Sequence, residues 1–81
     1  MKDWNSFNQS NHYKDYVVVN GTHYYVSTVS TFDAGWETMV FPCDEDNRII
    51  SWADLYCRHY PNESSAKEGH KHTIENLEKY I

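Results

Sequence analysis

The stretch that decides the fold is YVVVNGTHYYVSTV, residues 16–29. It contains two runs rich in β-branched and aromatic side chains, 16–19 and 22–29, joined by Asn20 and Gly21. Such side chains favour strands, and Asn-Gly is the dipeptide that best tolerates the two positive φ angles of a type I′ turn. The stretch therefore predicts a β-hairpin.

A second hairpin is predicted downstream, after a loop over residues 30–35. The run WETMVF, residues 36–41, alternates large apolar and polar side chains imperfectly and predicts a third strand. Pro42 is expected to end that strand, and the acidic segment 43–47 is expected to form a turn. The run RIISW, residues 48–52, then predicts a fourth strand paired with the third.

The C-terminal third predicts a helix. Periodicity does not decide between a helical turn and an extended strand for residues 53–60, and we favour the extended form. After Pro61, either Asn62 or Ser64 is expected to cap a helix that continues to the C-terminus, with Gly69 as a close-packing position. Residues at three- and four-residue spacing form its expected inner face: Ala66, His70, Thr73, Ile74, Leu77, and Tyr80 or Ile81.

Length and composition indicate one small domain. A chain of 81 residues buries only about 60–65% of the surface that its unfolded form exposes. Its aromatic content of 16% supplies bulky side chains for a thin core. We expect an irregular arm over 1–14, with aromatic side chains that dock on the body, and a single ββββα domain over 15–81. The predicted class is α+β, with a small antiparallel sheet of about four strands packed by one C-terminal helix.

Charge and hydropathy argue against several functions. The formal net charge of −5 has the wrong sign for a protein that binds the phosphate backbone, which disfavours direct nucleic-acid binding without excluding it. Residues 1–5 are polar, and no apolar run approaches the length of a membrane span. We expect a cytoplasmic protein in which Cys43 and Cys57 are free thiols, because the cytosol keeps thiols reduced.

Four residues of the C-terminal third are candidate metal ligands, because cysteine and histidine are the usual zinc ligands: Cys57, His59, His70 and His72. The one-residue gaps argue against a metal site, since two helical residues at that spacing point about 200° apart. We therefore predict no metal, with His70 hydrogen-bonded on the inner helical face and the other two histidines solvated. A small metal-binding module using Cys57, His59 and His70 stays open as an alternative.

Catalytic motifs are absent from the sequence. A Cys–His pair, or an acid–base pair such as Asp54 with His70, stays open because such partners meet in space. There is no Gly-rich phosphate loop, serine elbow or paired-carboxylate motif, and so small a fold seldom encloses a pocket. We predict no enzymatic activity and no cofactor. The acidic run 44–46 lacks the pattern of a calcium loop and is expected to be a solvated turn.

Acidic and aromatic residues together suggest a surface for a protein partner. Carboxylates would form a rim beside an exposed Trp36 or Trp52, as in many protein-binding patches. The rim residues would be Asp33, Glu37, Asp44, Glu45, Asp46 and Asp54. The alternative is that both tryptophans are core residues and that the carboxylates maintain solubility. The run 16–19 would also allow a homodimer if it lies at a sheet edge, unless it is a central, buried strand.

Two segments carry a family resemblance: WETMVF at 36–41, and RHY at 58–60 followed by SAKEGH at 65–70. Over residues 36–72 they resemble a group of small proteins of unknown function from tailed bacteriophages and prophages of Gram-positive bacteria. The shared features are an "ETMVF" strand and a helix that opens with "A-x-x-G-H". The resemblance implies a phage origin and a location in the host bacterial cytoplasm, and it assigns no site residue.

These observations favour a binding function. We expect a phage-encoded accessory protein that binds a host protein stoichiometrically and could inhibit a host enzyme or defence system. The alternative is a structural or assembly protein that self-associates through its sheet edge.

Overall fold

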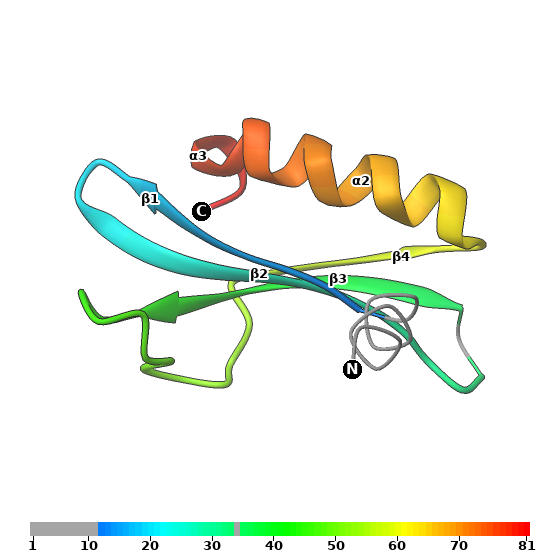
Figure 1. The fold of residues 1–81 in the computed structure, drawn as a ribbon, viewed down its shortest axis with the longest axis horizontal. Coiled ribbons are helices and arrows are strands. Elements are labelled where there is room, and N and C mark those ends of the chain that lie inside the picture. Colours follow the sequence, from blue (N-terminus) through cyan, green and yellow to red (C-terminus); the bar gives the residue numbers. More distant parts are fainter. Residues whose placement is uncertain (1–11, 34) are drawn as a thin grey trace, which may run out of the picture.

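The computed structural model describes residues 12–33 and 35–81. The strands are β1 (His12–Val19), β2 (Thr22–Ser30), β3 (Trp36–Cys43) and β4 (Tyr56–Tyr60), and the helices are α2 (Glu63–Glu75) and α3 (Leu77–Tyr80). Each strand pairs antiparallel with the next, in the order β1-β2-β3-β4, and α2 lies across one face of the sheet (Figure 1). The predicted α+β fold, four antiparallel strands and a C-terminal helix, is confirmed.

The first hairpin forms as its sequence predicts. Asn20 and Gly21 have φ angles of 51° and 84°, and Val19 pairs with Thr22 across the turn. Positive φ at both positions matches the right-handed twist of the flanking strands. β1 is an edge strand of the described sheet, which excludes the alternative of a central strand buried on both faces.

β1 begins earlier than expected, at His12. Tyr13 and Lys14 belong to the strand because β2 is long enough to pair with them, through Thr28 and Ser27. Residues 12–14, which were expected to belong to the arm, are part of β1, and residues 1–11 lie outside the described part of the chain. The Tyr13 hydroxyl donates a hydrogen bond of 2.5 Å to the Glu63 carboxylate at the start of α2.

Pro42 does not end β3. The strand continues to Cys43, and the predicted strand at 48–52 is instead part of a loop over 44–55. This loop meets β3 through an isolated bridge between Cys43 and Ile49 and through a backbone hydrogen bond from Leu55 to Val40. The Pro42 carbonyl accepts a hydrogen bond from the Ile50 amide, so the missing N–H of Pro42 faces the loop and leaves the ladder with β2 intact.

The fourth strand comes from the segment that periodicity left undecided. β4 covers residues 56–60, and the favoured extended form is confirmed. It pairs with the first half of β3, so that His59 lies opposite Glu37 and Tyr56 lies opposite Val40. The second hairpin therefore has a long connection in place of a tight turn.

Helix α2 begins at the predicted cap and ends before the C-terminus. The Asn62 side chain accepts a hydrogen bond from the Ser65 amide, which selects Asn62 over Ser64 as the N-cap. The helix breaks at Asn76, and α3 follows as a separate short turn. Gly69 is a close-packing position, as expected, because a Cβ atom there would lie 2.2 Å from the Tyr60 ring.

Both faces of the sheet carry apolar clusters. The face under α2, here called the covered face, packs Val26 and Val40 against Leu77 of α3. The opposite face, here called the open face, packs Tyr25, Phe41 and Cys43 against each other and against Met39 and Ile49. Loop 44–55 lies on the side of the sheet away from α2 (Figure 1).

Candidate functional site

The two tryptophans of the described residues lie in different environments. Trp36 is 9% exposed and its ring lies 6.0 Å from that of Tyr13. It is a core residue, as the alternative interpretation held, and is not available as the exposed anchor of a binding rim. Trp52 is 70% exposed and lies in loop 44–55, where a partner could reach it.

A row of four aromatic rings crosses the open face. Tyr16 stacks on Tyr25, with 5.1 Å between the ring centroids, and Tyr25 stacks on Phe41, with 6.2 Å between theirs. Phe41 then meets Trp52 edge to face at 5.0 Å. The two inner rings are buried, whereas Tyr16 and Trp52 are more than half exposed. This aromatic row is anchored in its middle and accessible at both ends.

The acidic residues divide into separate groups. Asp44, Glu45, Asp46 and Asp54 lie in or beside loop 44–55, which also carries Trp52. Asp33 lies in the loop between β2 and β3, which is at the other end of β3 (Figure 1). The structure therefore brings the acidic run and Trp52 into one loop, and it places Asp33 elsewhere.

Asp44 has a structural role within its loop. Its carboxylate accepts hydrogen bonds of 2.9 Å from the amides of Asp46 and Arg48. The bond from Arg48 contributes most to lowering the pKa of this carboxyl group. Glu45 and Asp46 are exposed, so these two carboxylates of the acidic run are the ones presented to solvent.

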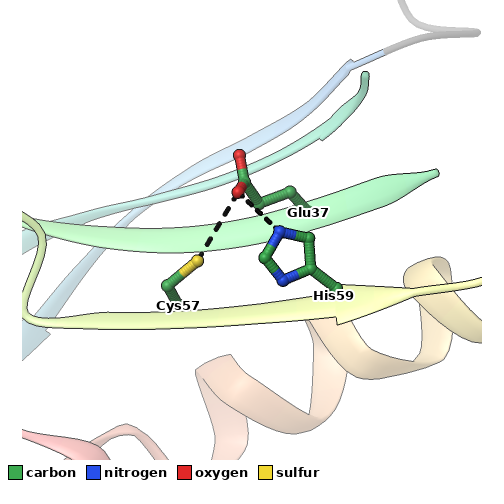
Figure 2. Close-up of side chains that lie close together, drawn as sticks. All are labelled: Glu37, Cys57 and His59. Atoms are coloured by element: carbon green, nitrogen blue, oxygen red, sulfur yellow. Dashed lines mark hydrogen bonds and ion pairs between the residues drawn. The ribbon is translucent and has the colours of Figure 1, made fainter. Parts of the chain in front are cut away.

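Three ligand-type side chains meet on the open face, at the junction of β3 and β4 (Figure 2). The Glu37 carboxylate lies 2.9 Å from His59 Nε2, and Cys57 Sγ donates to the same carboxylate oxygen at 3.6 Å. All three ligand atoms lie within 4.8 Å of one another. We call this group the ligand cluster.

The electrostatics of the ligand cluster argue against a nucleophilic cysteine. Partial burial raises the pKa of the Cys57 thiol, and the charge of Glu37 and the hydrogen bond to it raise the pKa further. The thiol is therefore protonated at neutral pH, whereas reactive cysteines have depressed pKa values beside cationic groups. A Cys–His nucleophilic pair is thus disfavoured, because His59 pairs with the Glu37 carboxylate and the thiol does likewise.

His70 belongs to a polar network on the covered face. Its Nε2 atom lies 2.8 Å from Asp15 and its Nδ1 atom lies 2.6 Å from the Thr28 hydroxyl. Thr28 in turn shares a 2.6 Å hydrogen bond with Thr38. The prediction that His70 is a hydrogen-bonded residue on the inner helical face is confirmed, and its carboxylate partner is Asp15 in place of the suggested Asp54.

This network resembles an acid–histidine–hydroxyl relay in its order of groups, but only the acid, Asp15, is exposed, and the histidine and hydroxyl groups are closed to substrates. Thr28 and Thr38 have no exposed surface, and His70 is 6% exposed. Buried polar groups are stabilised when each finds a partner, and here each one does. The network therefore holds α2 on the sheet.

The histidines and cysteines considered for a metal are regrouped by the fold. His70 points into the covered face, and His72 lies exposed on α2 with a hydrogen bond to Tyr80. His59 is exposed, as predicted, but it is paired with Glu37. Both cysteines are free. The sequence does contain one indication of the ligand cluster, the spacing Cys57-x-His59. Residues two apart on a strand point to the same face of the sheet.

Comparisons with known proteins add no identity. A scan against protein-family models found no match, and neither the curated proteins nor the solved structures contained a similar chain. Within residues 12–33 and 35–81, neither helix has the length and apolar character needed to cross a bilayer.

Proposed function

We propose that this protein acts by stoichiometric binding to another protein through the open face of its sheet, without catalysing a reaction. The observation that carries the proposal is the aromatic row, whose buried middle fixes two exposed ends, Tyr16 and Trp52. Rigid aromatic side chains at the centre of an interface supply much of its binding energy. The row is a preformed anchor of this kind.

Apolar side chains extend the proposed surface. Val18 is 56% exposed and lies two residues after Tyr16 in β1, on the same face of the sheet. Ile50 and Leu55, in loop 44–55, are 65% and 46% exposed. Single exposed apolar residues are common, but a group of them around an aromatic row is typical of an interaction site.

The negative charge near Trp52 favours a partner with basic residues. Glu45 and Asp46 stand exposed in the loop that carries Trp52, and the whole chain has a formal net charge of −5. A partner with an apolar centre and a basic rim would complement this surface and would associate faster at low salt. We propose a host protein of a phage-infected bacterium as that partner, in the host cytoplasm, with inhibition of a host enzyme or defence component as the outcome.

Affinity capture with matched variants tests this proposal. The tagged protein is incubated with bacterial host lysate, and retained proteins are quantified by mass spectrometry against a Trp52→Ala variant. Phe32→Ala is the control, because Phe32 is fully exposed but lies in the loop between β2 and β3. We expect one stoichiometric partner that Trp52→Ala loses and Phe32→Ala keeps.

The acidic rim needs a separate variant. Glu45→Lys with Asp46→Lys reverses two exposed charges and leaves the Asp44 carboxylate, which organises the loop. We expect this variant to associate with the partner more slowly, and we expect its association rate to depend less on salt. Charges at the rim of an interface act mainly on the rate at which the two proteins meet. A partner retained equally by the wild type, Trp52→Ala and the charge-reversed variant would contradict the open-face proposal.

Self-association through β1 is a second candidate. β1 has eight residues and an outer edge that no strand pairs with in the described part of the chain. Unpaired backbone groups along such an edge can pair with a second copy. Light scattering at high concentration distinguishes the two candidates: a dimer that persists in Trp52→Ala would support edge pairing, and a monomer would exclude it.

A further inference from the structure

We propose that the ligand cluster, Glu37, Cys57 and His59, binds a single zinc-class divalent metal ion. The proposal is independent of the protein partner, because it uses a different part of the open face. It concerns side chains that neither apolar cluster uses.

The sheet itself places these ligands together. Cys57 and His59 are two residues apart on β4, so both side chains point to the same face. Glu37 lies directly opposite His59 on β3. The three donors thus come from two hydrogen-bonded strands, and the backbone spacing that holds them does not depend on a flexible loop.

The donor set selects the type of metal. A thiolate, an imidazole and a carboxylate are the three side-chain ligands that zinc uses, whereas calcium and magnesium require oxygen donors. The Cys57 thiol would release its proton to solvent when the metal binds, because only the thiolate is a ligand. Softer donors also suit cobalt, which takes similar sites. The carboxylates of Glu37 and Asp54 both act on the Cys57 thiol electrostatically, so the cluster lies in a region of negative potential that favours a cation.

The observed distances are close to those of a tetrahedral site. With metal–ligand bonds of about 2.0–2.3 Å, neighbouring donors lie about 3.3–3.7 Å apart. The Cys57–Glu37 separation of 3.6 Å already falls in this range. The His59–Glu37 separation of 2.9 Å must widen by a few tenths of an ångström. No pair exceeds 4.8 Å, so side-chain rotations alone would complete the geometry.

The proposed site has three protein ligands and one open position. His59 retains 55% of its side-chain exposure and Glu37 retains 22%, so water can reach the metal and complete the coordination. Three protein ligands with a fourth position for water is the arrangement of open zinc sites, in contrast to closed structural sites with four. We therefore expect reversible binding that is not required for folding.

Cobalt substitution tests the site directly. The full chain, with any histidine tag removed and its thiols kept reduced, is titrated with Co²⁺ while near-ultraviolet and visible absorption are recorded. We expect one equivalent to bind, with a thiolate-to-cobalt charge-transfer band and the intense visible bands of a tetrahedral site. Zn²⁺ should displace the cobalt and remove both signals.

Variants separate the proposed site from adventitious binding. Cys57→Ser should abolish the charge-transfer band, and His59→Ala should weaken Co²⁺ binding by about ten-fold or more. His72→Ala is the control, because His72 is an exposed histidine away from the cluster, and it should bind as the wild type does. Circular dichroism checks that each variant is folded.

Two results would overturn the proposal. One is a folded wild-type protein that binds no Co²⁺. The other is binding that His59→Ala leaves unchanged, because the metal would then sit on a lone thiol or on unrelated histidines.

Discussion

The two faces of the sheet differ in how they treat polar and apolar side chains. On the covered face, His70, Thr28 and Thr38 are buried and bonded to each other, and His70 also pairs with the exposed Asp15 at the edge of the network. On the open face, large apolar groups such as Tyr16 and Trp52 remain exposed. The covered face thus buries side chains that are common in catalytic sites, a histidine and two hydroxyl groups. The open face exposes large aromatic side chains, which are more common in a core.

This difference separates structure from function. The buried part of this network, whose members all have hydrogen-bond partners, fixes the docking of α2, and its histidine and hydroxyl groups have no access to a substrate. The exposed ends of the aromatic row and the ligand cluster contribute less to folding, and the binding roles proposed above rest on their presence at the surface. Comparing matched residues on the two faces tests this assignment.

The largest expected effect comes from a leucine on the covered side. Leu77 is 1% exposed and packs against Val26 and Val40, so Leu77→Ala should lower the free energy of unfolding by about 2–5 kcal/mol. Leu55→Ala, at a 46% exposed leucine of loop 44–55, should change it by about 0.5 kcal/mol or less. Urea denaturation followed by circular dichroism measures both, and equal losses would remove the distinction between the two sides.

The next effect concerns the polar network. Thr28→Val keeps the shape of the side chain but removes the hydrogen bonds that Thr28 makes to His70 Nδ1 and to the Thr38 hydroxyl, which should cost about 1–3 kcal/mol. Thr22→Val, on the exposed start of the same strand, is the matched control and should be close to neutral. A neutral Thr28→Val would show that the network does not hold α2 in place.

The smallest effect is expected at the exposed end of the aromatic row. Trp52→Ala removes an edge-to-face contact with Phe41 and should lower the free energy of unfolding by about 0.5–1.5 kcal/mol. The variant therefore stays folded, which makes it usable in the capture experiment. A loss as large as that of Leu77→Ala would instead make Trp52 a core residue.

The sequence predicted local elements better than it predicted pairings. The Asn-Gly hairpin and the capped helix follow from φ preferences and from spacing, which act within a few residues. The fourth strand was predicted at 48–52 but lies at 56–60. The prediction failed because which segment pairs with β3 depends on long-range contacts, and because Pro42 is tolerated where β3 lacks a strand partner on one side.

The candidate sites show the same limit. Trp52 and the acidic run were predicted because they are neighbours in the sequence. The sequence left the burial of Trp36 open, because it depends on distant segments: its ring lies beside Tyr13 of β1, and it pairs with Tyr60 of β4. The sequence did not predict the ligand cluster, because the cluster depends on Cys57 and His59 sharing one face of β4 and on the pairing that brings Glu37, 20 residues from Cys57, opposite His59.

The sequence by itself determined the α+β class, the first hairpin, the helix cap and the absence of a known catalytic motif, because each depends on residue type and short-range spacing. The tertiary structure alone decided which side chains are presented and which are buried. Only the register of β3 with β4 places Glu37 beside His59, and only the packing of α2 on one face leaves the ends of the aromatic row exposed on the other. Burial and register are properties of paired segments, and local propensity does not contain them.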